Sequence, residues 1–206
     1  MATFILLPDG TVIGAGNQWK NADGSGTANY NDCDNDNDDT DYIKTDDGTN
    51  STDEVTFTFA NSSQSGIASI TSVQIKFKAR NTSNRNNFVK VSQTGTSISN
   101  GTDTITVAGT LSNNTYTLYS GTAETTYDGS TAWDTDLTQI NNLQVNLEKF
   151  RNNLSGTHLR ISYLYAEVTY VEPTAGYSNN VAGIDDSDIR GVNGILTANI
   201  RKVNEI

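Results

Sequence analysis

The chain is short of the residues on which most catalytic and metal centres depend. Its 206 residues include one cysteine, Cys33, and one histidine, His158. A single thiol cannot form a disulfide within the chain, and one thiol with one imidazole is too few for zinc sites and for most catalytic triads. We therefore expect a protein that is not an enzyme, that needs no cofactor, and that is stabilised by packing rather than by crosslinks.

Basic residues and long apolar runs are also scarce. The 13 Lys and Arg face 24 Asp and Glu, which gives a formal net charge of -11. A surface this acidic repels a phosphate backbone, so nucleic acid is not an expected partner. The start, Met1–Pro8, lacks the basic leader and long apolar run of a signal peptide, and no stretch is long enough for a membrane helix. We expect no membrane contact.

What the chain does contain is typical of β-structure. Pro is limited to 2 residues and Gly numbers 17, while Thr, Ser, Asn and Asp stand where helix formers would dominate a helical protein. Apolar residues alternate with polar ones in Val55–Phe59 and Val73–Arg80, the period of a strand with one buried face. Further strands are predicted at Asn87–Ser92, Asp103–Ala108, Thr115–Ser120, Asn142–Phe150 and His158–Val171.

Many short strands separated by turn residues predict an all-β fold, an antiparallel β-sandwich or jelly roll. One short helix is predicted within Asp134–Asn141, with Asp134 or Thr135 as its N-cap. Pro173 closes the last long strand, because proline cannot donate to a β-ladder. The predicted domains are therefore a sandwich over residues 1–172 and an extended tail over residues 173–206.

The tail carries an eleven-residue repeat, Val181-Ala-Gly-Ile184, Val192-Asn-Gly-Ile195 and Val203-Asn-Glu-Ile206. Glycines and β-branched residues disfavour a helix here, and short extended arcs followed by polar turns suit the pattern. A segment this short cannot close a core of its own, so we expect it to lie against a partner; a disordered tail is the alternative. The predicted partner-binding anchors are Val181, Ile184, Ile189, Val192, Ile195, Ile200, Val203 and Ile206.

An acidic segment offers alternating carboxylates at Asp32, Asp34, Asp36 and Asp38, the oxygen ligands that Ca²⁺ prefers. The helix-loop-helix calcium motif is absent, because counting from Asp32 its glycine and glutamate positions hold Asn37 and Ile43. An acidic loop held in solvent is the favoured interpretation, and an irregular Ca²⁺ site is the alternative.

Aromatic residues supply another candidate surface. Broad aromatic faces can stack on sugar rings, although such side chains more often belong to the core and its rim. On the last long strand we expect Leu164 and Val168 to be buried and the tyrosines to pack a second interface. The aromatic candidates are Trp19, Trp133, Tyr127, Tyr163, Tyr165 and Tyr170. We expect His158 to be an exposed turn residue.

Several of these features together resemble a group of tailed-bacteriophage virion proteins. The resemblance is carried by Phe4–Gly10, Trp19 after a Gly/Asn stretch, the acidic segment before Asp41-Tyr-Ile43, Thr131-Ala-Trp133, Leu143-Gln-Val145, Leu164–Tyr170 and the terminal repeats. It implies a β-sandwich structural protein on the virion surface, made in the host cytoplasm. Its implied partners are the major capsid protein or tail proteins, together with further copies of itself in a homo-oligomer such as a trimer.

Two functions of different classes follow from these expectations. The leading hypothesis is a head decoration, or cement, protein attached through its repeat tail. The rival is a tail-fibre or tail-tip receptor-binding protein that recognises a host-surface glycan. A glycan hydrolase is a remote third, since nothing in the spacing of the acidic residues selects a catalytic pair.

Overall fold

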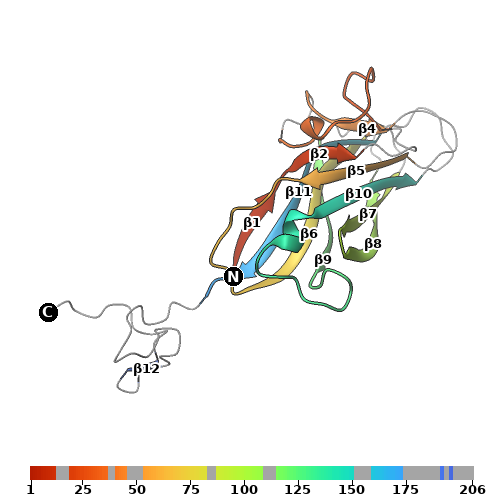
Figure 1. The fold of residues 1–206 in the computed structure, drawn as a ribbon. Helices are drawn as coiled ribbons and strands as arrows, with labels where there is room; N and C mark the ends of the chain where they lie inside the picture. The colour runs from red at the N-terminus through yellow and green to blue at the C-terminus, as the bar shows by residue number, and fades with distance from the viewer. Residues whose placement is uncertain are drawn as a thin grey trace. The chain divides into compact units, whose positions relative to one another are not determined.

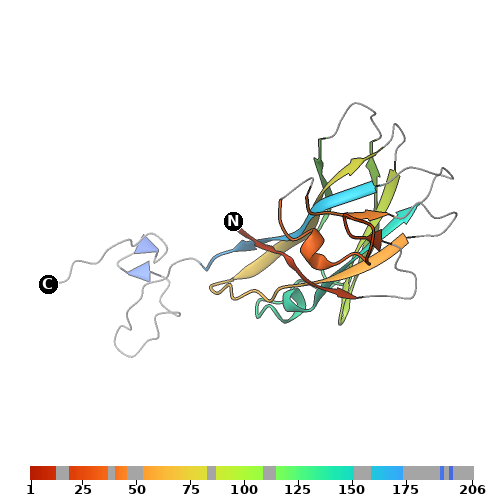
Figure 2. The ribbon, with the colours of Figure 1, turned by 90° about the horizontal axis from the view of Figure 1, so that it is seen from above.

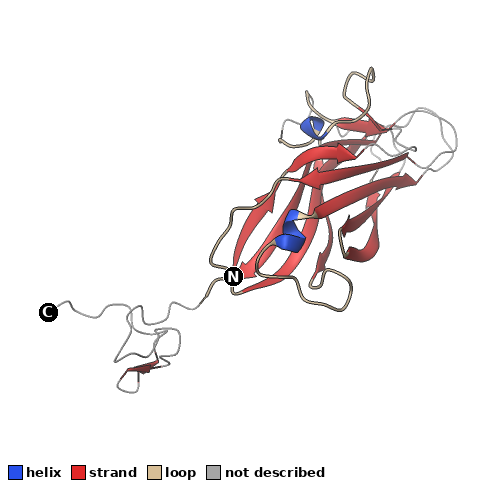
Figure 3. Cartoon of the chain, viewed as in Figure 1, coloured by secondary structure: helices blue, strands red, loops and turns tan. Residues whose placement is uncertain are grey.

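The structure is a computed structural model that describes residues 1–12, 19–36, 40–45, 53–82, 87–108, 115–150, 159–173, 191–192 and 195–196. The chain divides into two units, Met1–Val171 and Glu172–Ile206. In the first unit strands predominate and the helices are short (Figure 3).

The larger sheet of the first unit has six strands. Its order is β3 (Trp19–Lys20), β4 (Ile43–Thr45), β11 (Leu159–Val171), β6 (Ser69–Asn81) and β9 (Thr117–Glu124), and β1 (Ala2–Leu6) also pairs with β11. Each of these pairs is antiparallel. The long strands β6 and β11 lie side by side at the centre of the sheet (Figure 1).

The second sheet has five strands, also antiparallel. Its order is β2 (Pro8–Val12), β5 (Asp53–Phe59), β10 (Leu143–Phe150), β7 (Asn87–Gly95) and β8 (Ile98–Val107). The strands of both sheets can be followed in a second view (Figure 2). This arrangement confirms the predicted antiparallel β-sandwich.

Strand alternation builds the core between the sheets. Phe57 on β5, Phe77 on β6 and Leu147 on β10 are completely buried, and they belong to one apolar cluster with Leu164 and Val168 of β11. Burying a side chain of this size contributes roughly 1.5–3 kcal/mol. The period-two pattern therefore predicted both the strands and the faces that they bury.

Two short strands, β4 and β1, pair with the same edge of β11. Strand β4 pairs with its start and β1 with its end. In the gap between them the backbone carbonyl of Cys33 accepts a hydrogen bond from the N–H of Leu164 at 2.8 Å. The segment around Cys33 therefore completes the edge of the larger sheet and satisfies a donor that would otherwise be buried without a partner.

A β-bulge in β11 changes which side chains share a face. The register of β11 on β6 shifts between Ile161 and Tyr163, and the residue between them, Ser162, is buried. Arg160 and Tyr163 consequently both point away from the core although they are three residues apart. A bulge inserts one residue into a strand and so reverses the alternation beyond it.

The helical prediction is correct in place and wrong at its start. Helix α1 spans Thr138–Asn141 and follows Leu137, whose backbone is left-handed at φ 65° and makes no side-chain cap. The predicted cap, Asp134, still stabilises the helix, because its carboxylate accepts a hydrogen bond from the backbone N–H of Gln139 at 3.1 Å. A 3-10 helix, η1 (Tyr30–Asp32), lies in the loop after β3.

In the second unit the structure describes one short hairpin. Strand β12 (Gly191–Val192) pairs with β13 (Ile195–Leu196), and Val192 lies opposite Ile195. The other residues of the repeats lie outside the described part of the chain. No helix among the described residues is long and apolar enough to cross a membrane.

Candidate functional site

The first two carboxylates of the predicted calcium segment bind neighbouring groups of the loop that contains η1. Asp32 accepts the backbone N–H of Asn29 at 3.0 Å, and the Asn29 side chain returns a bond in a reciprocal capping box. Burial raises the pKa of Asp32. Asp34 accepts a hydrogen bond from the side-chain amide of Asn35 at 2.9 Å.

The third carboxylate is neutralised by a lysine of the larger sheet. Both oxygens of Asp36 lie 2.5 Å from Nζ of Lys78 on β6. Asp38 lies outside the described residues, within which no group of three or more His, Cys, Asp and Glu side chains gathers as a metal site would require. The calcium prediction assumed free carboxylates, whereas Asp32, Asp34 and Asp36 each have a partner within the chain.

The two tryptophans are core residues and are not open to sugar rings. Trp19 is completely buried, and Trp133 is 4% exposed with its indole N–H donating to the carbonyl of Glu124 at 3.0 Å. The ring of Tyr127 packs 6.2 Å from that of Trp133. Of the two interpretations of these aromatic residues, the structure supports core packing.

The tyrosines of β11 divide between the two faces of the strand. Tyr170 is buried beside Phe4, so its predicted place with the other tyrosines is wrong. Tyr163 and Tyr165 are half-buried on the outer face, where their ring centroids lie 4.9 Å apart. Partial burial raises the pKa of Tyr163, with a contribution from Tyr165. Leu164 and Val168 are buried as predicted.

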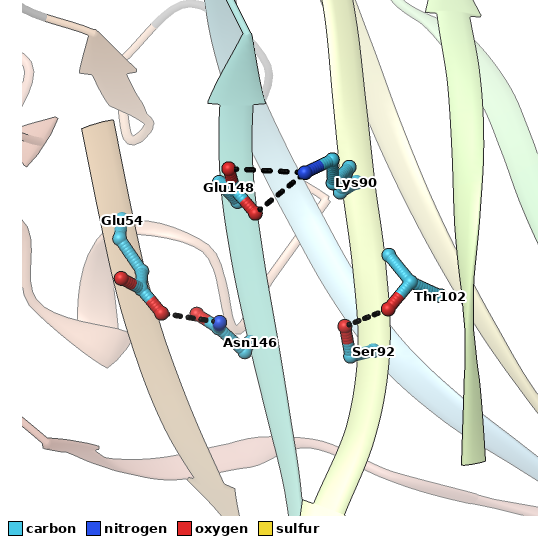
Figure 4. A network of polar contacts seen from close by, with 6 residues as sticks. All are labelled: Glu54, Lys90, Ser92, Thr102, Asn146 and Glu148. Carbon is cyan, nitrogen blue, oxygen red and sulfur yellow. Dashed lines mark hydrogen bonds and ion pairs between the residues drawn. The ribbon is translucent and has the colours of Figure 1, made fainter. Parts of the chain in front are cut away.

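The outer face of the five-stranded sheet is a polar surface whose side chains bind one another (Figure 4). Lys90 of β7 reaches both oxygens of Glu148 on β10 at 3.3 Å. Beside them Asn146 donates to Glu54 of β5 at 2.5 Å. In the next row Ser92 of β7 and Thr102 of β8 are 3.1 Å apart.

This polar surface also contains a pair of acids on neighbouring strands. Glu54 and Glu148 are register partners across β5 and β10. Lys90 forms an ion pair with Glu148, and the Asn146 amide donates a hydrogen bond to Glu54. Both acids of this face are thus bound by side chains of the same sheet.

Two further aspartates stabilise backbone turns and edges. Asp103 of β8 crosses to the other sheet, where it accepts the backbone N–H of Thr122 at 2.5 Å and its hydroxyl at 2.6 Å. Asp128 accepts the backbone N–H groups of Thr131 and Ser130 at 2.6 and 2.9 Å. These bonds to the charged form lower the pKa of Asp128 to about 2.

The sequence did not predict a concentration of basic residues on the outer face of the larger sheet. Eight Lys and Arg have described side chains; two of them, Lys90 and Lys149, lie elsewhere. The remaining six are Lys20, Lys44, Lys76, Lys78, Arg80 and Arg160. Each alternates with a buried neighbour on its strand, so all six project away from the core. Within a single strand, the sequence shows only that Lys76, Lys78 and Arg80 alternate with apolar residues and so share one face.

The remaining sequence candidates fall mostly outside the described residues. Cys33 is buried, and burial raises the pKa of its thiol well above the ordinary value. His158 lies outside the described part. Of the eight predicted anchors, the described hairpin includes the backbone of Val192 and Ile195, and the other six are not described.

No protein-family model and no curated protein matches this chain. Among solved structures, the CBM36-1 domain of a multidomain xylanase from the hindgut metagenome of Trinervitermes trinervoides is similar over 82% of this chain and 98% of that domain, with 11% identity and a TM-score of 0.40. A Family 11 carbohydrate-binding module from Clostridium thermocellum, in complex with a mixed-linked tetrasaccharide, covers 80% and 86%, with 11% identity and a TM-score of 0.35. Similarity at this level carries no inference about ligand or function.

Proposed function

We propose that this chain is a non-enzymatic structural protein of a tailed-bacteriophage virion, attached to the particle through the repeats in residues 173–206. The sandwich is the exposed body of the protein, and the repeat unit is its attachment segment. In the particular form that we favour, the protein decorates the head and reinforces contacts among capsid proteins.

The observation that carries this proposal is the separate second unit with its repeated motif. In this unit the structure describes two short antiparallel strands, with Val192 opposite Ile195. A two-stranded hairpin is marginally stable alone, so it needs a surface to cover its apolar side chains. An anchor that becomes fully covered contributes roughly 1.5–3 kcal/mol, and many copies on a symmetric particle convert modest contacts into avidity.

The aspartates of the sandwich support a structural role, because they bind other groups of the same chain. Asp36 neutralises Lys78, Asp103 holds the backbone of Thr122, and Asp128 holds its own turn. In each case a carboxylate binds a group of the same chain. A protein that works by packing and attachment uses its acids in this way.

Immunogold electron microscopy on intact virions, with antibody against the folded sandwich, tests the proposal directly. Label distributed over the head is the expected result and establishes the decoration role. Label confined to the tail or its tip would instead favour the receptor-binding function. The absence of label from purified virions would contradict both.

Removal of residues 173–206 separates attachment from recognition. In the decoration function the truncated protein no longer binds particles that lack the native protein, while the full chain does. A receptor-binding protein would keep its binding to host cells after this truncation. A matched full-length variant, Val192→Asp with Ile195→Asp, is expected to lose particle binding as the truncation does, because two charges replace apolar anchors.

A further inference from the structure

We propose that the outer face of the larger sheet binds an uncharged sugar chain, which lies from a tyrosine pair on β11 to a groove at the edge strand β9. The tyrosine pair consists of Tyr163 and Tyr165, whose ring centroids lie 4.9 Å apart at an interplanar angle of 37°. Both side chains point outward, since Leu164 between them is buried. Two neighbouring aromatic rings on a sheet face offer the broad amphipathic surface on which sugar rings stack.

The phenol groups of the tyrosine pair are available to a ligand. Both side chains are half-buried, so part of each ring is exposed. Within the described part of the chain, neither hydroxyl has a hydrogen-bond partner. Partial burial raises the pKa of Tyr163, with smaller contributions from Tyr165 and Asp36, so its hydroxyl remains a hydrogen-bond donor. Each tyrosine thus combines an apolar face with a polar tip, as a sugar requires.

The charged groups beside the tyrosine pair bind one another. The register of β11 and β6 places Lys76 and Lys78 opposite the two tyrosines. Lys76 pairs with Glu167 at 2.6 Å, and Lys78 pairs with Asp36 at 2.5 Å. A charged polymer would compete with one partner of each ion pair, whereas an uncharged one leaves both pairs intact. Sugar hydroxyls can also form charge-assisted hydrogen bonds with these groups.

A groove lies where the same row of residues reaches the edge of the sheet. Lys76 has Tyr165 on one side and Ser120 of β9 on the other, so the three are consecutive neighbours across roughly 10 Å. Ser120 lines a cavity of about 230 Å³ between the edge strands β9 and β8. The other lining residues are Gly121 and Thr122 of β9 and Asp103, Thr104 and Ile105 of β8. The path from the rings to the groove suits a chain of sugars rather than a single one.

The walls of the groove are held in place by hydrogen bonds. Asp103 accepts the backbone N–H and the hydroxyl of Thr122 at 2.5 and 2.6 Å. Gln74 donates to the carbonyl of Gly121 at 2.8 Å. A Cβ at Gly121 would lie 2.8 Å from the Asp103 carboxylate, so glycine allows this close approach. A groove that is already ordered loses little freedom when a ligand enters it.

The composition of the face favours a sugar over other occupants. Leu118 of β9, opposite Lys78, is 48% exposed, but it lies among charged and hydroxylated side chains. The core of a protein interface is more apolar and is depleted in charged residues. Anionic polymers are repelled by a protein of net charge -11. Aromatic faces, hydroxyls and paired charges together fit a neutral polyol.

Affinity electrophoresis of the full chain tests the proposal, in native gels that contain dextran, galactomannan or hydroxyethylcellulose, each an uncharged polysaccharide. We expect at least one of them to retard the protein, and added salt to leave the retardation unchanged, because salt screens only charges. Tyr165→Ala should weaken this binding tenfold or more, since it removes a stacking face. Tyr165→Phe keeps the ring and should retain most of the binding.

A second pair of variants tests the groove. Ser120→Gln places a larger side chain at an exposed position of the groove wall and should also weaken binding. The matched control Thr106→Gln places the same side chain at an exposed position of β8 outside the groove, and it should leave binding unchanged. Thermal unfolding shows whether each variant is folded. If Tyr165→Ala is unfolded, the comparison of Ser120→Gln with Thr106→Gln decides.

Lack of retardation by all three polysaccharides would overturn the proposal, as would equal weakening by Ser120→Gln and Thr106→Gln. Equal binding by the wild-type protein and a folded Tyr165→Ala would also overturn it. Retardation by anionic polygalacturonate alone would do the same, and so would a dimer in size-exclusion chromatography that Tyr165→Ala disperses, because a second copy would then cover the face. Particle attachment through residues 173–206 does not involve this face, so the two proposals fail separately.

Discussion

The two outer faces of the sandwich have the same antiparallel architecture and different pairs of charged neighbours. On the five-stranded sheet, Lys90 lies opposite Glu148 and binds it. On the larger sheet, Lys44 lies opposite Arg160, whose other neighbour is Arg80. On the first face a base thus lies opposite an acid, and on the second three basic residues are consecutive register neighbours.

This difference shows how register, rather than composition, gives a sheet face its role. Both faces are built from strands of the same acidic, Thr-rich and Asn-rich chain. A face whose cross-strand neighbours bind one another has little free energy to gain from a partner. Neighbours of like charge repel each other and destabilise the sheet.

The largest expected effect is a loss of stability on substitution of Gly95, which lies at the end of β7 in the five-stranded sheet. Gly95 ends β7 at φ 149°, and an added Cβ would overlap the backbone oxygen of Asn142. Gly95→Ala should lower the free energy of unfolding by about 3 kcal/mol or more, since both the backbone and the contact are strained. Urea denaturation measures this loss.

The matched control for that substitution is Gly101→Ala on the neighbouring strand β8. A Cβ at Gly101 meets nothing within 4 Å, so its stability should change by less than about 0.5 kcal/mol. Equal losses for the two variants would show that the hairpin does not constrain Gly95.

A smaller loss is expected at the inner side of the strand that carries Lys44. The buried hydroxyl of Thr45 accepts hydrogen bonds from Lys149 Nζ and from the backbone N–H of Leu159, both at 3.0 Å. Thr45→Val removes this acceptor at nearly constant volume and should cost about 1–3 kcal/mol. The half-buried Thr56→Val on the polar face, with one long bond to Asn146, should cost less than about 0.5 kcal/mol. A reversed order in thermal or urea unfolding would contradict this assignment.

Acid should remove the contribution of the most strongly bound carboxylate. The folded pKa of Asp128 is about 2, below the ordinary 3.8, so its stabilisation is complete above pH 3.8 and disappears as the pH falls through 2. The wild-type protein should therefore lose more stability between pH 4 and pH 2 than Asp128→Asn does. An identical pH dependence in the two proteins would show that the turn does not bind the charged carboxylate.

The sequence predicted the elements well because they depend on local alternation. Val73–Arg80 and Val55–Phe59 fall within β6 and β5, and the buried positions follow the predicted period. It could not predict that Lys20, Lys44, Arg160 and Arg80 are register neighbours, because the register of four strands brings them together. The bulge at Ser162 added a second obstacle, since it brings Arg160 and Tyr163 to one face against the simple alternation.

The acidic segment illustrates the same limit for a candidate site. Alternating aspartates are visible in the sequence and suit a hard cation. The partner that Asp36 finds is Lys78, 42 residues away on β6. Spacing along the chain shows which ligands are available, and only the fold shows which of them are already bound.

The central claim, that register makes Lys90 and Glu148 attract each other and Lys44 and Arg160 repel each other, is tested most directly by two double-mutant cycles. Lys90–Glu148 and Lys44–Arg160 are each replaced singly and together by Gln, and unfolding free energies are measured at low salt. We predict a favourable coupling for the first pair and an unfavourable one for the second, each roughly 0.2–1 kcal/mol and smaller at high salt. A favourable or zero coupling between Lys44 and Arg160 would contradict the account, because register neighbours of like charge would then not repel each other.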